Sequence, residues 1–206
     1  MDKNVTRRRA KVASRVGVAL LCLFQSMTPH AAPAISREYE IKAAFLFHFT
    51  RFMDWPAESF TDRTSPIVIG VIGDDPFGAE LASIAEGRRV NGRPIVARYI
   101  TSEEDARDTH LLFVGLTREV DVARLMQAIV GFPVMTVGES AEFAAQGGAI
   151  TFVRQDDKVR FEINTASAAR AHVRISAQLE KLAVAHRTTT TFMEGACCAM
   201  SLFGAN

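Results

Sequence analysis

The stretch PIVIGVIGDDPFGAELASIAEG, residues 66–87, contains the pattern that decides the fold. Residues 66–73 form a short, wholly apolar and β-branched run, which is typical of a buried strand. Asp74 or Asp75 can then cap a helix, Pro76 suits its first turn, and Gly87 ends it. A buried strand followed at once by a helix is the repeating unit of an α/β domain.

The same alternation continues along the chain. Strands are expected over residues 93–100, 110–116 and 132–138. Residues 102–107 predict a short polar turn or helix, residues 117–130 an amphipathic helix and residues 139–148 a short helix. Residues 149–164 predict an antiparallel hairpin, and residues 165–183 a last helical region. The sequence therefore predicts a single three-layer α/β domain, with about six strands in a mostly parallel sheet, a C-terminal antiparallel hairpin and helices on both faces.

The segment EYEIKAAFLFHFTRFMDWP, residues 38–56, has the length of a helix and is apolar on nearly every side. Such a helix either fills the space beside the sheet or forms an interface. Helical spacing predicts a core-facing stripe made of Ile41, Ala44, Phe45, His48 and Phe52. The contacts with a dimer mate or partner are then expected to come from Tyr39, Phe47 and Phe49.

Residues 1–34 are typical of a secretory signal peptide. Six basic residues and one acid within residues 1–15 precede an apolar core over residues 16–24. This core is shorter than the roughly 20 residues that span a membrane. Ala32 and Ala34 fit cleavage after Ala34, which predicts a periplasmic protein; the alternative is an uncleaved N-terminal anchor.

Removing residues 1–34 changes the charge of the chain. The whole sequence has 24 Lys and Arg against 23 Asp and Glu, whereas residues 35–206 keep 18 basic and 22 acidic side chains, a net charge of −4. A net negative domain argues against nucleic acid or anionic lipid as the main partner. The 172 residues that remain are enough for one domain with a hydrophobic core.

The sequence predicts no catalytic residue, metal site or cofactor. It has no Gly-x-Ser-x-Gly motif, phosphate loop or Gly-x-Gly-x-x-Gly motif. Asp74 and Asp75 follow the first strand, where ligands often bind in open α/β sheets, but helix capping explains them more simply. A metal site would need convergence of scattered histidines, namely His48, His110, His172 and His186.

All three cysteines lie outside the predicted domain, residues 35–185. Cys22 falls in the predicted signal peptide, and Cys197 and Cys198 fall in residues 186–206, where lost periodicity predicts a weakly structured tail. Adjacent cysteines rarely bond to each other, because the small ring strains the peptide. They are therefore tail thiols or form an intermolecular disulfide.

A polar row on one predicted strand is the candidate ligand site. In KVRFEIN, residues 158–164, alternation places Arg160, Glu162 and Asn164 on one face. The next segment can return Arg174 toward Glu162, and Arg51 is a further cation that could converge there. Such a cluster suits a zwitterion or a phosphate. The alternative is a solvated strand face with a plain Glu162–Arg174 salt bridge.

Several stretches together resemble the YfiR-type family of periplasmic proteins. An aromatic-rich first helix that ends in Trp-Pro, combined with Phe-Glu-Ile-Asn and Ile-Ser-x-x-Leu, carries the resemblance. It covers roughly residues 36–185, through REYEIKAAFLFHFTRFMDWP, IVIGVIGDDPFGAEL, NGRPIVAR, HLLFVG and GGAITFVRQDDKVRFEINTASAARAHVRISAQLEKLA.

The resemblance implies a dimeric α/β repressor without catalytic activity. Such proteins bind the periplasmic portion of an inner-membrane diguanylate cyclase, or of a related sensor kinase, and hold it off, which lowers cyclic di-GMP and biofilm formation. An outer-membrane lipoprotein can sequester them. The best-known member of this family is redox-responsive through disulfides inside the domain, whereas this domain has no cysteine, so a redox switch inside it is not expected. The alternatives are a small-ligand sensor for an amino acid or nucleotide and, less favoured, a secreted enzyme.

The first testable prediction concerns the N-terminus. The basic start and short apolar core predict removal of residues 1–34, so the mature protein should begin close to Ile35. N-terminal sequencing of protein from a periplasmic extract measures this directly. An intact Met1 found in the membrane fraction would contradict it.

Overall fold

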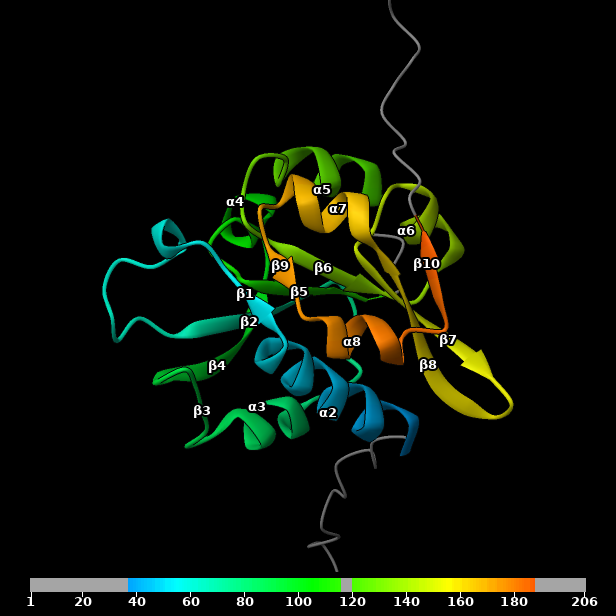
Figure 1. Cartoon of the computed structure of the whole chain (residues 1–206), viewed down its shortest axis with the longest axis horizontal. Helices are drawn as coiled ribbons and strands as arrows, with labels where there is room; N and C mark the ends of the chain where they lie inside the picture. The colour runs from blue at the N-terminus through cyan, green and yellow to red at the C-terminus, as the bar shows by residue number, and fades with distance from the viewer. Residues whose placement is uncertain (1–36, 116–119, 188–206) are drawn as a thin grey trace, which may run out of the picture. The chain divides into compact units, whose positions relative to one another are not determined.

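The structure, a computed structural model, describes residues 37–115 and 120–187 (Figure 1). The first element is the longest helix, α2 (Arg37–Arg51). The other helices are η2 (Ala57–Ser59), α3 (Ala79–Ala85), α4 (Glu103–Ala106), α5 (Val122–Ala128), α6 (Ala141–Ala145), α7 (Thr165–Arg170) and α8 (Ala177–Leu182). The strands are β1 (Met53–Asp54), β2 (Ile67–Ile72), β3 (Arg89–Val90), β4 (Arg93–Ile100), β5 (Leu111–Val114), β6 (Met135–Gly138), β7 (Ile150–Gln155), β8 (Lys158–Asn164), β9 (Arg174–Ile175) and β10 (Ala185–Arg187).

Eight of the described strands form one sheet in the order β10-β8-β7-β6-β5-β2-β4-β3. Strands β2, β4, β5, β6 and β7 pair in parallel, and β8 returns antiparallel to β7. Numbered along the chain, the five parallel strands lie in the order 2-1-3-4-5, the arrangement of flavodoxin-like doubly wound sheets. The predicted α/β class, mostly parallel sheet and C-terminal hairpin are confirmed. The sheet has β3 and β10 in addition to the six predicted strands.

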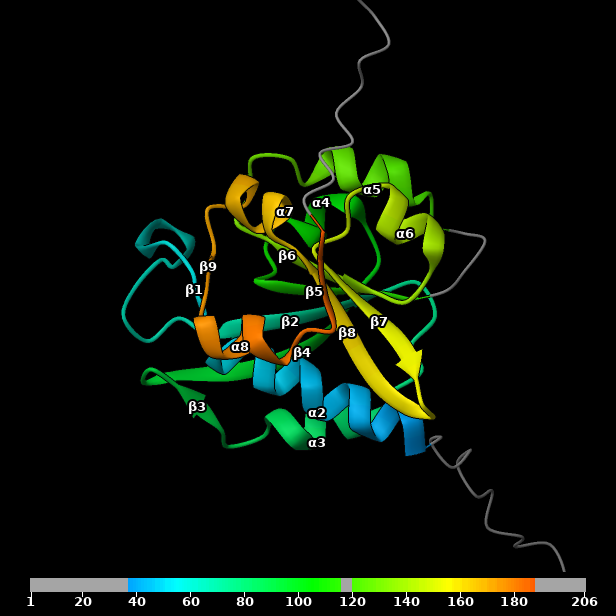
Figure 2. The same ribbon diagram turned by 45° about the vertical axis from the view of Figure 1, so that its right-hand side comes forward.

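Helices cover both faces of this sheet (Figure 2). One hydrophobic cluster joins the sheet to α2, α3 and α8, and a second joins the opposite face to α4, α5 and α6. Strand β5 shows the division, because Leu111 and Phe113 belong to the first cluster while Leu112 and Val114 belong to the second. This alternation follows from the period of two in a strand that is buried on both faces.

The edge hairpin β3–β4 was missed by the sequence prediction. Its turn is Asn91-Gly92, with φ of 51° and 81°, and it pairs Val90 with Arg93. Two consecutive residues with positive φ are typical of a type I′ turn, for which Asn-Gly is the strongest short signal. The dipeptide was present in the sequence, but two-residue β3 is too short to show an alternating pattern.

The predicted helical region over residues 165–183 is wrong in its middle. Helix α7 ends before His172, which has a φ of 55°, and the chain then pairs with β1 through Met53–Ile175 and Asp54–Arg174. Helix α8 begins afresh at Ser176, whose side chain accepts the amide of Leu179. The β1–β9 pairing joins segments more than a hundred residues apart, so local periodicity could not reveal it.

The predicted core stripe of α2 is only partly correct, because Phe45 and Phe52 pack against the first hydrophobic cluster whereas Ile41 and His48 are exposed. Ile41 is 41% exposed, whereas Leu46, Phe47 and Phe49 are buried. The helix packs against α3 as well as the sheet, so more than one side of it is covered. A helix apolar on nearly every side gives no clear periodic signal for which side that will be.

Other predictions fall on residues that the structure does not describe. The signal peptide lies within residues 1–36, and Cys197 and Cys198 lie within residues 188–206. The sheet itself continues to Arg187, two residues past the predicted end of the domain at 185. Within residues 37–115 and 120–187, no helix is both long and apolar enough to cross a membrane.

Candidate functional site

Helix α2 crosses the sheet from its carboxyl edge to its amino edge. Near the start of α2, Tyr39 and Lys42 contact Glu139, which directly follows β6. Beyond its end, Trp55 donates to the carbonyl of His110, which directly precedes β5. Since β5 and β6 are parallel, the two contacts lie at opposite edges, and we treat these edges as the candidate sites.

The carboxyl-edge network is a buried set of charged and polar side chains. Lys42 is 4% exposed and pairs with Glu139, whose side chain is 10% exposed. Lys42 also pairs with Glu38 at 2.6 Å, and the Tyr39 hydroxyl donates to the second oxygen of Glu139 at 3.0 Å. The ammonium of Lys42 lies 4.4 Å from the centre of the Tyr39 ring. Each charge in this network therefore has a close partner, as a buried charge requires.

The pKa values of this network favour its charged form. Burial works to lower the pKa of Lys42, but hydrogen bonds and charges from Glu139 and Glu38 outweigh it and raise that pKa above its ordinary value. The hydrogen bond from Lys42 lowers the pKa of Glu38. Burial, followed by the hydrogen bond to Glu139, raises the pKa of Tyr39. Lys42 accordingly stays protonated and Tyr39 stays a neutral donor at neutral pH.

The loop after β2 fills the same edge with an aromatic side chain. Phe77 is fully buried and makes edge-to-face contacts with Phe113 at 4.7 Å and Tyr39 at 5.9 Å between ring centroids. Asp75 accepts the backbone amides of Phe77 at 2.9 Å and Gly78 at 3.2 Å. Asp75 therefore holds the turn that inserts Phe77, just before α3 begins at Ala79. In sheets of this strand order, ligands bind at the carboxyl ends of the strands. Here the chain's own side chains occupy part of that position.

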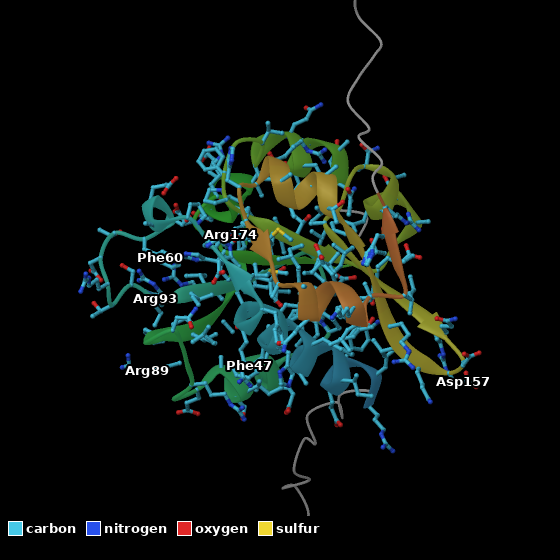
Figure 3. The ribbon with its side chains drawn as sticks, in the orientation of Figure 1. Phe47, Phe60, Arg89, Arg93, Asp157 and Arg174 are labelled. Atoms are coloured by element: carbon cyan, nitrogen blue, oxygen red, sulfur yellow. The ribbon has the colours of Figure 1, made fainter. Side chains whose placement is uncertain are left out.

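The amino edge carries an aromatic stack built on His110. Trp55 donates through Nε1 to the His110 carbonyl at 3.1 Å, and the Phe60 ring stacks on the imidazole at 4.6 Å. Arg93 lies at the start of β4, and its guanidinium is 3.6 Å from the centre of the Phe60 ring (Figure 3). This stack explains the Asp-Trp-Pro ending of the first helical segment, because the tryptophan fixes the chain that leads from β1 into β2.

A depression of about 260 Å³ opens beside this stack. Asp54 and Arg93 are the charged residues in its lining. Arg93 is already engaged, since its Nη1 donates to the carbonyls of Asp62 at 2.7 Å and Ser65 at 3.0 Å. The depression is smaller than most ligand sites, which are about 300–1,000 Å³. The full lining consists of Met53, Asp54, Trp55, Ala57, Phe60, Ile67, Asn91 and Arg93.

His110 is neutral in the folded protein. Its Nδ1 accepts the Val68 amide at 3.1 Å, which leaves the imidazole proton on Nε2. Burial, the main cause, lowers the pKa of His110 to about 4; the nearby Ser59 backbone works to raise it and Arg93 works to lower it. His110 is therefore a structural acceptor at the amino edge rather than a charged group.

The five residues predicted to bind a ligand share no interaction partner and are not brought together in one site. Glu162 pairs with Arg187 at 2.6 Å, not with the predicted Arg174. Arg174 is 85% exposed in its side chain and lies 3.8 Å from Asp54 (Figure 3). Asn164 is buried and its side chain accepts the Ser167 amide at the start of α7. The remaining two, Arg51 and Arg160, are exposed. The prediction missed the Glu162–Arg187 pair because it placed residue 187 in a weakly structured tail.

The residues predicted to contact a partner lie mostly inside the domain. Phe49 is fully buried and meets Phe161 at 5.0 Å, and Phe47 is 6% exposed beneath the Arg88 guanidinium at 4.8 Å. Tyr39 is half-buried in the carboxyl-edge network. In this conformation Phe47 and Phe49 offer a partner almost no surface, because α2 is covered by the sheet and by α3.

Sequence reasoning named Tyr39 only as a partner contact and missed Lys42 and Glu139, the charged pair of the carboxyl-edge network. Lys42 was the available signal, since it is the only Lys or Arg between Arg37 and Arg51 and follows Glu38 by four residues. A lysine within such an apolar helix requires a buried partner. That Glu139 is this partner depends on tertiary structure. Within the described ranges, no three His, Cys, Asp or Glu side chains come together as metal ligands.

Comparisons with known proteins give one family match and a distant structural neighbour. The sequence profile described as YfiR/HmsC-like matches residues 39–184, which is more than half of the chain. That family consists of periplasmic regulators of diguanylate cyclases rather than enzymes. Curated proteins give no significant match. A conserved domain protein from Vibrio cholerae O1 biovar El Tor str. N16961 is similar at 11% identity and a TM-score of 0.45, over 72% of this chain and 60% of that one.

The Lys42–Glu139 pair generates a stability prediction. Lys42→Met should lower the free energy of unfolding by about 3–5 kcal/mol, because it leaves the Glu139 carboxylate buried without its cation. The double variant Lys42→Met/Glu139→Gln should regain much of this loss, since the glutamine oxygen can still accept from Tyr39. Urea denaturation at neutral pH measures both.

Glu38→Gln is the matched control for this cycle. It removes the more exposed partner of Lys42, so it should cost about 0–1 kcal/mol. If Lys42→Met were no more destabilising than Glu38→Gln, the carboxyl-edge pair would not have the role described. The same conclusion would follow if the double variant were no more stable than Lys42→Met.

His110 generates a pH prediction. Because its pKa falls from 6.5 to about 4 on folding, the unfolded chain binds a proton between these pH values that the folded protein does not. Stability should therefore fall as the pH is lowered from 6.5 to about 4, by roughly 3 kcal/mol from this residue alone. His110→Asn, which keeps an acceptor for Val68, should be less stable at neutral pH and should lack this part of the pH dependence. His48→Asn, on the exposed side of α2, is the control. Parallel stability curves for wild type and His110→Asn would refute the assignment.

Proposed function

The chain belongs to the YfiR/HmsC-like family, and from that premise we propose that it is a periplasmic protein that represses an inner-membrane diguanylate cyclase or a related sensor protein. It does so by binding the periplasmic portion of that protein, and it thereby lowers cyclic di-GMP and biofilm formation. It catalyses no reaction itself. Its further partners on this proposal are a second copy of the chain and an outer-membrane lipoprotein.

The observation that carries the proposal is the extent of the family match together with the geometry of the carboxyl edge. The match covers residues 39–184, nearly all of the described domain. At the edge where sheets of this order hold small ligands, Phe77 is buried against Tyr39, and Lys42 is buried in its pair with Glu139. A domain whose customary ligand position is taken by its own side chains is suited to act through its outer surface.

A small-ligand sensor is the second candidate, and one observation favours it. The depression beside the His110 stack is lined by an acidic residue, Asp54, and an aromatic residue, Trp55. Its volume of about 260 Å³ suits only a small molecule. The cation that an anionic ligand would need, Arg93, already donates to Asp62 and Ser65. We therefore place this candidate second.

The proposal predicts a change in cellular cyclic di-GMP. Deleting the gene should raise the cyclic di-GMP concentration and biofilm mass, because the cyclase loses its repressor. Full-length protein supplied from a plasmid should restore both. Protein lacking residues 1–34 is the matched control and should fail to restore them, since it cannot reach the periplasm.

Affinity capture of the tagged mature protein from solubilised membranes, with mass spectrometry, should recover a membrane cyclase or sensor kinase. Unchanged cyclic di-GMP together with capture of neither kind of protein would reject the proposal.

A further inference from the structure

Strand β4 has an edge that the described chain leaves partly unpaired. On one side, Ile95 to Ile100 of β4 pair in parallel with β2 over six residues. On the other side, β3 pairs only with Arg93 and Pro94. Strands β3 and β4 lie at one end of the sheet, and β10 lies at the other (Figure 1). Most of β4 is therefore an edge strand, although it is the longest strand in the sheet.

The backbone groups that face this open edge can be assigned from one hydrogen bond. The Ile95 amide donates to the Arg88 carbonyl at 3.2 Å, so Ile95 faces away from β2. Because a strand alternates, the amides and carbonyls of Ala97 and Tyr99 point the same way, and those of Arg98 point toward β2. No strand of the described chain pairs with Ala97 or Tyr99 on that side. Their backbone groups are available to a further strand.

A groove runs beside this edge, between β4 and α3. It has a volume of about 160 Å³, and the side chains of Leu81 and Ala82 from α3 face Ala97 and Tyr99 from β4 across it. Tyr99 is 57% exposed, and its hydroxyl donates to the Gly73 carbonyl at 2.8 Å. An open strand edge next to a helix, with an apolar groove between them, is the geometry in which extended peptides add to a sheet. The groove is completed by Val71, Asp75, Gly78 and Arg98.

Arginines lie on β4 and in the β3–β4 hairpin beside this edge. The side chain of Arg98 is exposed and makes no hydrogen bond or ion pair with the part of the chain that the structure describes. Arg89 is exposed and uses Nη1 for the Gly92 carbonyl, and Arg93 lies in the same hairpin (Figure 3). Asp75, the one acid that lines the groove, accepts from the amides of its own loop, and Glu86 caps the end of α3. A second copy of the chain would bring the same arginines to a shared edge, whereas an acidic segment would meet opposite charges.

We propose that the open edge of β4 binds an extended, acidic segment of a partner protein as an additional strand. Its backbone pairs with Ala97 and Tyr99, its apolar side chains enter the groove against α3, and its carboxylates meet Arg98 and Arg89. This inference deepens the proposed function, since the partner there is a membrane-bound cyclase or sensor protein. It rests on that function for the identity of the partner, but not for the binding mode.

Amide hydrogen exchange of the mature protein, followed by NMR, tests the edge directly. In the protein alone, the amides of Ala97 and Tyr99 should exchange rapidly, and that of Arg98 slowly. A short synthetic peptide of alternating glutamate and valine should slow the exchange at Ala97 and Tyr99. A peptide of alternating lysine and valine, with equal strand propensity and opposite charge, should not.

Two variants separate the backbone from the charge contribution. Arg98→Glu should weaken binding of the acidic peptide by roughly tenfold or more, the effect of losing a charge-assisted contact. Lys158→Glu makes the same charge change on the β7–β8 hairpin and should leave the affinity unchanged. Ala97→Pro removes the outward amide at a position where an edge strand tolerates proline, and should abolish binding with the melting temperature largely retained. If Ala97→Pro does not fold, the comparison of acidic-peptide affinity between Arg98→Glu and Lys158→Glu still tests the proposal.

The outcomes distinguish this inference from its alternatives. If the acidic peptide gives no protection, if both peptides protect equally, or if Arg98→Glu binds as the wild type does, the inference is overturned. It is also overturned if the amides are already protected in the protein alone and Ala97→Pro converts a dimer into a monomer, because a second copy then holds the edge. If the mature protein binds the acidic peptide but deletion of the gene leaves cellular cyclic di-GMP unchanged, only the proposed function is rejected. A response to deletion without peptide binding would reject only the edge.

Discussion

The buried ion pair between Lys42 and Glu139 is the contact on which the position of the first helix depends. Removing two charges from water costs several kcal/mol for each, and only close pairing offsets that cost. Glu139 is fixed by its place directly after β6, so Lys42 can be satisfied in very few positions of α2. Once the start of α2 is held there, its length carries Phe49 into the aromatic cluster and brings the following chain to the amino edge, where Trp55 meets His110.

A helix anchored at both edges of the sheet changes what the fold can do. In doubly wound sheets that bind nucleotides, the loop after the first parallel strand is rich in glycine and leaves room for phosphate at the carboxyl edge. In this chain that loop instead inserts Phe77 between Tyr39 and Phe113. The common fold is thus retained while part of its usual binding position is filled, and the surfaces left for interaction are the outer helix faces and the strand edges. This is why the same strand order is compatible with a regulatory role in the YfiR/HmsC-like family.

The parts of the structure that could be predicted are those set by local patterns. Buried parallel strands are continuous apolar runs, so β2, β4 and the β7–β8 hairpin were found to within a residue or two, and β5 and β6 were found with up to three extra residues at one end. The features that were missed depend on distant segments. The covered sides of α2, the interruption at His172 and the pairing of Glu162 with Arg187 are each decided by an element that arrives later in the chain. For the candidate site, Lys42 could have been recognised as a charge in need of a partner, but Glu139 could not have been identified as that partner.

The open edge of β4 shows how one set of charged side chains can both limit unwanted association and select a partner. An unpaired strand edge invites association with other chains, and proteins limit this with charged residues on the edge. On β4 the charges are arginines, while residues 35–206 carry a net negative charge. Identical copies that approach through this edge bring arginine against arginine, so self-pairing is disfavoured there. An acidic strand meets the opposite situation, because the same guanidinium groups attract it before any backbone hydrogen bond forms. Charge at the β4 edge can therefore select the partner, and the backbone of Ala97 and Tyr99 can bind any strand that the charges admit.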